Sequence, residues 1–459
     1  LSETHRHCYD IVRRLTLQPR KGVQIMKKTA RRTFLGGLSL ISASPAVLRS
    51  KPLAHDLRSE IAALPLFDSH EHLLPESQRV SSPQDLLSLL SHYTIADLVS
   101  AGLDSKLVHS LSETTKPVTE RWKIVAPWWE RGRNTAYARA LCLAIRDVYG
   151  VEEINEKTCK TISERIQAAN RPGLYQRVLG EMARIETAVV DDYWNARPTK
   201  PEGRWFVLAH KFDRFVQVTS RKAIEELEKL SDRSITALGH LEEALVANFQ
   251  GWRASEFRMV AVKSTLAYNR PIHYREVSRH DAEREFERVA GGTLPPPSPH
   301  PWDQATQPAA APLQDYMFHR VVQLALEHHL PFQIHTGILA GNKSIVTNTN
   351  PTLLTNLFLD YPQVKFDLLH ASYPYTGELA ALAKSFPNVY ADLCWIYVIS
   401  PEVGRRALSE LIETVPGNKI LAFGGDYRFV ELSYAHSIMA RDVVSRVLAE
   451  KVQSGFMTT

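Results

Sequence analysis

The sequence predicts an α/β protein built as a closed (β/α)8 barrel, with a helix-rich insertion after the first strand. Eight short, nearly continuous apolar runs have the composition of strands that are buried on both faces of a parallel sheet. Segments with helical spacing separate these runs, and such alternation indicates parallel strands joined by right-handed crossovers. A chain of 459 residues is long enough for one such barrel with insertions.

The predicted elements follow one another along most of the chain. The strands are the runs 64–67, 187–190, 205–209, 259–262, 332–334, 364–369, 388–391 and 420–423. The helices are 136–149, 224–230, 235–249, 313–328, 353–359, 377–384, 404–414 and 438–452. Residues 80–185 are helix-rich and form the insertion. Residues 294–312 are rich in proline and alanine, which predicts an extended loop.

The first 50 residues are expected to lie outside the barrel, which we place at residues 57–455. Residues 26–50 combine Arg31 and Arg32 with a moderately apolar run that ends in small residues, the pattern of a twin-arginine export signal. Met26 is then the natural start, and residues 1–25 are a non-native upstream extension. We therefore expect export to the periplasm or beyond. A basic tail that targets nothing is the alternative.

The composition is that of an ordinary globular protein and excludes several classes. Hydrophobic residues make up 44% and charged residues 23% of the chain. The net charge of +5 comes largely from the first 60 residues, so we expect no nucleic-acid partner. No segment has 18 consecutive apolar residues, so no stable membrane span is expected. The four cysteines, Cys8, Cys142, Cys159 and Cys394, form no CxxC pair, which argues against disulfides and thiolate zinc sites.

Histidine and aspartate side chains stand at the ends of four predicted strands. His70 and His72 follow the first strand, and their spacing places both side chains on the same side of an extended segment. His335, His370 and Asp426 each follow a later apolar run. Because the carboxyl ends of barrel strands converge on one mouth, we expect these groups to meet there. Imidazole and carboxylate groups are ligands for zinc, manganese or iron.

This order of ligands resembles that of the amidohydrolase superfamily, which has His-x-His on strand 1, His on strands 5 and 6, and Asp on strand 8. The segments 331–337, 368–374, 388–393 and 423–426 resemble its amidohydrolase-related branch more narrowly. That branch includes relatives of uronate isomerase and the amidohydrolase domain that is fused to glutamine-synthetase-like domains. The resemblance covers residues 62–455 and is strongest after residue 255. It implies a TIM-type barrel and a divalent metal.

The chemistry of these side chains suggests a role for each. His70, His72, His335 and Asp426 would hold one divalent ion, with zinc favoured over manganese or iron, and leave one position for water. On the ion, the pKa of that water falls from about 15.7 toward about 7. Asp426 would accept the proton of the attacking water and pass it to the leaving group. His370 would either bind a second ion or polarise the substrate carbonyl.

Three further residues are candidates for the site. Lys263 follows the fourth strand, where some superfamily members carry a carboxylated lysine that bridges two metals. The favoured alternative is a lysine that pairs with a substrate anion or a nearby acid. Arg270 is either a bidentate ligand of a substrate carboxylate or a solvated loop arginine. Trp395, after the seventh strand, either lines the pocket or packs in the core.

The sequence favours a metal-dependent hydrolase that cleaves a C–N or C–O bond, in an amide or a lactone, of a small-molecule substrate. A substrate with a carboxylate and a homo-oligomeric assembly are both compatible with it. One alternative is non-hydrolytic chemistry on the same barrel, either decarboxylation or the proton transfer between C1 and C2 of a sugar acid that uronate isomerases perform. The helix-rich insertion resembles that of uronate isomerase relatives. The other alternative is a non-catalytic binding protein.

Overall fold

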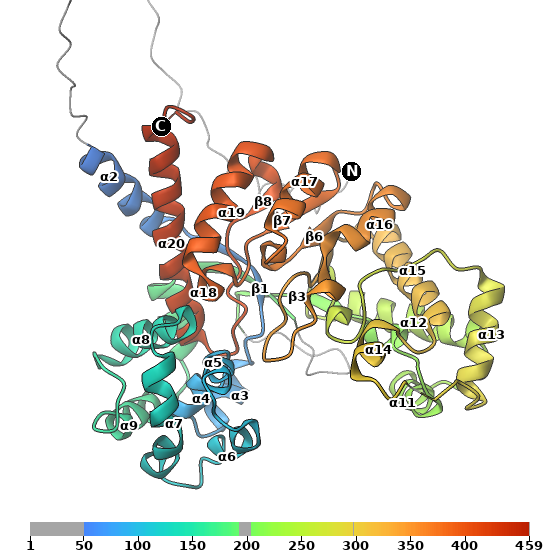
Figure 1. Cartoon of the computed structure of the whole chain (residues 1–459), viewed down its shortest axis with the longest axis horizontal. Helices are drawn as coiled ribbons and strands as arrows, with labels where there is room; N and C mark the ends of the chain where they lie inside the picture. Colours follow the sequence, from blue (N-terminus) through green and yellow to red (C-terminus); the bar gives the residue numbers. More distant parts are fainter. Residues whose placement is uncertain (1–49, 192–202, 297, 459) are drawn as a thin grey trace, which may run out of the picture.

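A computed structural model describes residues 50–191, 203–296 and 298–458, and it confirms the predicted barrel (Figure 1). Eight strands pair in parallel in chain order. They are β1 (Leu66–Glu71), β2 (Ile185–Val190), β3 (Phe206–Lys211), β4 (Met259–Ser264), β5 (Phe332–Ile334), β6 (Phe366–Leu368), β7 (Val389–Asp392) and β8 (Ile420–Leu421). Each of them overlaps one of the predicted apolar runs.

The ring of strands closes between β1 and the segment that follows β8. The amide of Ser69 donates a hydrogen bond to the carbonyl of Phe423 over 3.1 Å, and the amide of Asp426 donates one to the carbonyl of His70 over 2.9 Å. β1 itself extends to Glu71, which pairs with Val190 of β2. His70 therefore lies inside the strand, and the two sides of this seam carry candidate ligands.

Helices cover the outside of the barrel and fill the long β1–β2 connection. That connection contains α3 (Glu76–Ser81), α4 (Leu86–Leu90), α5 (Thr94–Ser100), η1 (Ser105–Leu107), α6 (Val108–Leu111), α7 (Val118–Gly132), α8 (Ala136–Tyr149), α9 (Cys159–Ala169) and the π-helical η2 (Gln176–Met182). The later helices are α10 (Asp213–Val216), α11 (Arg221–Ser231), α12 (Leu238–Arg253), α13 (Arg279–Ala290), α14 (Pro301–Thr306), α15 (Ala311–Glu327), α16 (Thr355–Asp360), α17 (Thr376–Ser385), α18 (Ile396–Ile399), α19 (Pro401–Thr414) and α20 (Val430–Gln453). The chain described begins with α2 (Ser50–Ala63), which packs on α20 (Figure 1).

The insertion is tied to the barrel through a buried charged contact on α20. Arg79 of α3 donates to the carboxylate of Glu431 over 2.9 Å, and both side chains are fully buried. Tyr149, the last residue of α8, donates to the same carboxylate over 2.5 Å. A buried carboxylate needs such partners, because an unpaired one would cost several kcal/mol (on the order of 3–5). This contact fixes the insertion, shown in blue to teal in Figure 1, against the last helix of the chain.

The expectation that residues 294–312 form an extended loop is wrong in part. α14 occupies residues 301–306, and α15 starts at Ala311. Pro301 stands at the first turn of α14, where proline is tolerated because the first amides of a helix have no partner inside the helix. The proline content was therefore a poor guide to the structure of this segment.

Two predictions fall on parts of the chain that the structure does not describe. The upstream extension (residues 1–25) and the twin-arginine-type segment (residues 26–50) lie outside the described residues, except for Ser50 at the start of α2. Within the described ranges, no helix combines the length and the apolar character that a bilayer span needs.

Candidate metal centre

The carboxylate of Asp426 lies among three histidines at the mouth of the barrel. Its Oδ1 is 3.1 Å from Nε2 of His72 and 3.6 Å from Nε2 of His70. Its Oδ2 is 3.8 Å from Nδ1 of His370. His70 lies in β1 and His72 directly follows it, while Asp426 lies in the loop after β8 and His370 in the turn after β6. The convergence that strand ends were expected to produce therefore holds for these four residues.

Two groups of metal-ligand atoms occur among the described residues. In each group the atoms lie within 4.8 Å of one another. The first consists of His70, His72 and Asp191, and the second of His370, Cys394 and Asp426. Sequence reasoning missed Asp191, although it directly follows the predicted run 187–190, the same signal that identified His335 and His370. It also assigned no site to Cys394, because the cysteines form no CxxC pair.

His335 is the predicted metal ligand that lies outside both groups. Its Nδ1 is 2.9 Å from Nε2 of His370, and its Nε2 is 3.0 Å from the carbonyl oxygen of Ile338. Both ring nitrogens are thus engaged, and the ring contacts His370 rather than Asp426. In this arrangement His335 orients His370. Residues that lie directly behind metal-binding histidines commonly have this role.

Lys263 of β4 lies beside the first group. Its Nζ is 3.3 Å from Nε2 of His70, and the side chain is almost fully buried. Burial lowers the pKa of Lys263, against the opposing effect of the negative charges of Asp191 and Asp426. The lysine is therefore placed to contact the centre, as either of its two predicted roles requires.

The buried histidines are held in the neutral form. Burial, followed by the nearby positive charge of Lys263, lowers the pKa of His70 well below its usual value and that of His335 to about 3. Burial also lowers the pKa of His370 well below its usual value, with His335 next in effect. Neutral imidazole is the form that binds metal ions.

The donor set fits a divalent cation. Nδ1 of His370 is buried and has no hydrogen-bond partner among the described residues, and Oδ1 of Asp426 is buried beside the ring nitrogens of His72 and His70. Buried polar atoms nearly always have hydrogen-bond partners. A buried ring nitrogen without one therefore indicates that a bound ligand, such as a metal ion, belongs beside it. Mixed nitrogen and oxygen donors suit zinc, manganese or iron. The side chain of His72 is 19% exposed, which gives the group access to solvent.

Backbone strain is concentrated at this mouth. His370, Trp395 and Asp426 have φ angles of 67°, 65° and 60°, in the left-handed region, and Tyr93 has 66°. For residues other than glycine such conformations cost on the order of 1 kcal/mol or more each, and they cluster where side chains must point in functional directions. The surrounding fold therefore holds these four side chains in place at a cost in stability.

Two carboxyl groups of β1 hold the strained loop after β8. Asp68 accepts a hydrogen bond from the amide of Gly425 over 2.9 Å, and Glu71 accepts one from the amide of Tyr427 over 2.7 Å. Burial raises the pKa of Asp68 to about 7 and that of Glu71 well above its usual value. A Cβ at position 425 would lie 1.9 Å from Oε1 of Glu71, so only glycine fits there. These contacts position the neighbouring Asp426.

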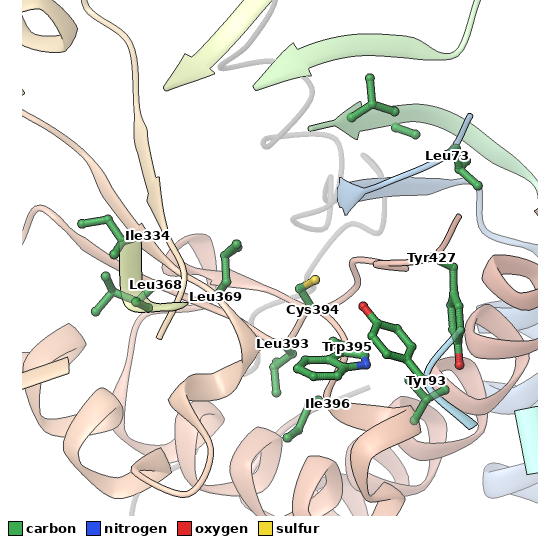
Figure 2. Packing of buried hydrophobic residues seen from close by; sticks show 14 of the residues in the cluster. Leu73, Tyr93, Ile334, Leu368, Leu369, Leu393, Cys394, Trp395, Ile396 and Tyr427 are labelled. Atoms are coloured by element: carbon green, nitrogen blue, oxygen red, sulfur yellow. The ribbon is translucent and has the colours of Figure 1, made fainter. Parts of the chain in front are cut away.

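An aromatic cluster covers one side of the centre. The hydroxyl of Tyr93 donates a hydrogen bond to the main-chain carbonyl of Asp426 over 2.7 Å. The ring of Trp395 lies 4.7 Å from that of Tyr93 and 5.2 Å from that of His370. Figure 2 shows Tyr93, Trp395 and Tyr427 together beside Cys394. No sequence signal marks Tyr93, because its place depends on how the insertion docks on the barrel.

Trp395 and Arg270, the two predicted substrate-binding residues, differ in their surroundings. Trp395 faces the centre, and its buried Nε1–H has no partner among the described residues. Arg270 is buried elsewhere: its guanidinium forms an ion pair with Asp315 and donates to Gln314 and to the carbonyl of His273. The structure therefore shows Arg270 holding its own loop against α15, and its contact with substrate stays a prediction.

Comparisons with known proteins found one family model and several relatives. A family model described as amidohydrolase matches residues 277–455. A uronate isomerase of Rhizorhabdus wittichii is 24% identical over 446 residues, which cover 89% of this chain and 91% of that protein. The chain is therefore similar to amidohydrolases over residues 277–455 and to this uronate isomerase over most of its length.

Other matches cover either a part of the chain or most of it. The protein FluG of Emericella nidulans is 34% identical over 153 residues, which cover 32% of this chain but only 18% of FluG. The crystal structure of a uronate isomerase from Thermotoga maritima superposes with a TM-score of 0.70 at 19% identity, covering 88% of this chain and 92% of that one. Amidohydrolase family members bind a divalent metal, and the two groups of donors described above are candidate sites for it.

Proposed function

We propose that this chain is a metal-dependent isomerase of a sugar acid of the uronate class, which moves a proton between C1 and C2 to interconvert aldehyde and ketone forms. The observation that carries the proposal is the extent of the likeness. The uronate isomerase relative covers 89% of the chain, a share too large to leave out the insertion from α3 to η2. The amidohydrolase family match covers only residues 277–455.

The residues at the barrel mouth provide the proton carriers that this reaction needs. One group must take the proton from C2 and return it at C1, and another must move a proton between the two oxygens. Asp426 is proposed as the first and neutral His370 as the second, since their Oδ2 and Nδ1 atoms lie 3.8 Å apart in a buried setting. An ion held by His70, His72 and Asp426 would polarise the carbonyl oxygen and so acidify the neighbouring C–H bond.

The site also offers positive charge for a substrate carboxylate. Lys263 lies 3.3 Å from His70. Lys211, at the end of β3, forms an ion pair of 3.1 Å with Asp191 and remains partly exposed. We propose that these two ammonium groups attract the carboxylate in place of Arg270, whose guanidinium is occupied by Asp315.

The test is to incubate the purified chain with glucuronate and galacturonate in deuterated water and to follow the sugars by proton NMR. We expect the anomeric C1 proton signals of the sugar acid to give way to those of a ketose, with deuterium incorporated at the position that receives the proton. Chelation should abolish this conversion and a divalent ion should restore it. The proposal would fail if the metal-loaded protein cleaves a lactone or an amide but neither converts these sugars nor exchanges their protons for deuterium.

A metal-dependent hydrolase is the second candidate. The match of residues 277–455 to the amidohydrolase family favours it, and that stretch contains His370 and Asp426. A panel of N-acyl amino acids and lactones, assayed with the same metal-loaded protein, separates the two candidates. Release of carbon dioxide from an acid in the panel would point to the decarboxylase alternative.

Export through the twin-arginine-type segment is a separate proposal, supported by Arg31 and Arg32 and the apolar run after them. It can be tested by fractionating bacteria that express the chain from Met26, with a variant in which both arginines are replaced by lysine as the control. Accumulation of both proteins in the same compartment would contradict it.

A further inference from the structure

Cys394 is the one thiol within the described ranges that lies among metal-ligand groups. It follows β7, and its Sγ lies within 4.8 Å of ligand atoms of His370 and Asp426. All three side chains are fully or almost fully buried. Figure 2 shows the sulfur at the centre of the view, above the ring of Trp395. The thiol is therefore part of the centre and not of the outer core.

Asp426 faces this second group with a different oxygen from the one that faces the first. Its Oδ1 points to His70 and His72, while its Oδ2 lies 3.8 Å from Nδ1 of His370. A carboxylate in this position can bind two ions, one through each oxygen. The geometry thus separates two ion positions on either side of Asp426.

His370 is oriented as a metal ligand toward the second position. Its Nε2 contacts Nδ1 of His335 over 2.9 Å, while its Nδ1 is buried without a hydrogen-bond partner among the described residues. Metal-binding histidines typically use one ring nitrogen for the ion and the other for such an orienting contact. The unpartnered nitrogen faces the carboxylate of Asp426, which belongs to the same group as the sulfur.

Space for the sulfur depends on a glycine in the strained loop. A Cβ at Gly424 would lie 2.9 Å from Sγ of Cys394 and 2.5 Å from Oγ of Ser69. Any side chain there would displace the sulfur from its position beside Asp426. The lack of a side chain at Gly424, in the loop after β8, therefore leaves room for the Cys394 thiol at the centre.

We propose that His370, Cys394 and Asp426 form a second metal site, which takes a thiophilic divalent ion such as zinc, and that Asp426 is shared with the site of His70, His72 and Asp191. Thiolate and imidazole together favour zinc over magnesium, calcium or manganese. Donors that now lie within 4.8 Å of one another need to close by about 1 Å, to reach Zn–N distances of about 2.0–2.1 Å and a Zn–S distance of about 2.3 Å.

Binding of the ion replaces the S–H bond of Cys394 with an S–metal bond, and the proton passes to solvent. Burial, followed by the charge of Asp426, raises the pKa of the free thiol well above its usual value. A divalent cation in contact with a thiol nevertheless deprotonates it. The absence of a CxxC pair excludes only a site whose ligands are close in sequence. Here the three ligands are far apart in sequence and follow β6, β7 and β8.

The test is a titration of the metal-free full chain with cobalt(II), followed by absorption. We expect two equivalents to bind and one of them to produce the thiolate-to-cobalt charge-transfer band. In Cys394→Ser the band and one equivalent should be lost, whereas the other equivalent should remain. The matched control is Cys159→Ser, which removes another fully buried thiol, in the insertion, and should keep both.

A measurement on the unmodified chain covers the case in which Cys394→Ser fails to fold. X-ray absorption of the zinc-loaded protein should show a sulfur neighbour at about 2.3 Å. A spectrum with only nitrogen and oxygen neighbours, binding of a single cobalt equivalent, or a charge-transfer band that survives in Cys394→Ser would each overturn the proposal. An ion in this second position takes up Nδ1 of His370 and Oδ2 of Asp426, so the proton transfer proposed above requires the position to be empty. The metal-binding readouts themselves do not depend on which reaction the protein catalyses.

Discussion

The hydroxyl of Tyr93, in the insertion after β1, donates a hydrogen bond of 2.7 Å to the main-chain carbonyl of Asp426, in the loop after β8. Replacing Tyr93 by phenylalanine should leave this buried carbonyl without its donor. We expect unfolding to become easier by about 1–3 kcal/mol, and zinc binding to weaken because Asp426 is held less firmly. Thermal unfolding and zinc titration calorimetry measure the two effects. Tyr137→Phe, in a ring stacked 5.2 Å from Tyr93, keeps the hydrogen bond and should retain zinc affinity.

Asp426→Asn should remove both a metal ligand and a proton carrier. We expect turnover to fall by about 10²–10⁴-fold and the metal content of the purified protein to drop. Asp367→Asn is the matched control, because Asp367 is a buried carboxyl of the same barrel whose pKa is raised to about 6 by burial, and it pairs with Gln333. Elemental analysis together with the isomerase assay checks both variants. Unchanged metal content in Asp426→Asn would contradict the assignment of this residue.

Arg270 should matter for stability and not for substrate affinity. Arg270→Met leaves the carboxylate of Asp315 buried without its main partner, so we expect a loss of about 3–5 kcal/mol in the free energy of unfolding. KM for the substrate should stay the same. Arg275→Met removes the exposed partner of the same carboxylate and should change stability by less than about 1 kcal/mol. A large rise in KM for Arg270→Met would instead restore the predicted contact with substrate.

The buried His210 should make the protein less stable in acid. Burial lowers its pKa from 6.5 to about 3, against the opposing charge of Asp191, so the unfolded chain binds a proton that the folded chain does not. The stability that depends on neutral His210 is complete above pH 6.5 and is lost progressively as the pH falls toward 3. His210→Phe keeps a ring against Trp252, which stacks on His210 at 3.9 Å, and removes the titration.

The measurement is denaturant unfolding of both proteins from pH 8 to pH 4. The dependence of the free energy of unfolding on pH should be shallower in His210→Phe by about one proton below pH 6.5. Parallel curves for the two proteins would show that this histidine does not carry the effect.

The sequence predicted the barrel well, because strands that are buried on both faces leave nearly continuous apolar runs. The same rule brought His70, His72, His370 and Asp426 together, since strand ends converge. Asp191 could have been found by it too. The position of a side chain within the mouth of the barrel could not be predicted in this way, because it depends on contacts between segments that are far apart in the sequence.

The surroundings of His335, Arg270 and Tyr93 illustrate those contacts. The orientation of the His335 ring is set by its hydrogen bond with the carbonyl of Ile338, in the turn that follows, and by its contact with His370. The position of Arg270 follows from the packing of α15, which brings Asp315 to it. Tyr93 reaches the site only because the insertion docks on α20. Periodicity and spacing describe single elements, and these three placements arise between elements.

The seam between β1 and the segment after β8 has a consequence for how the protein matures. The imidazoles of His70 and His72 are synthesised early, and the carboxylate of Asp426 comes some 350 residues later. A chain still being made holds the first without the second, and the donor set is complete only when the ring of strands has closed. Stable capture of the proposed ion would therefore report that the ring of strands has closed, and the time at which a newly made chain takes up a divalent ion would measure that last step of folding.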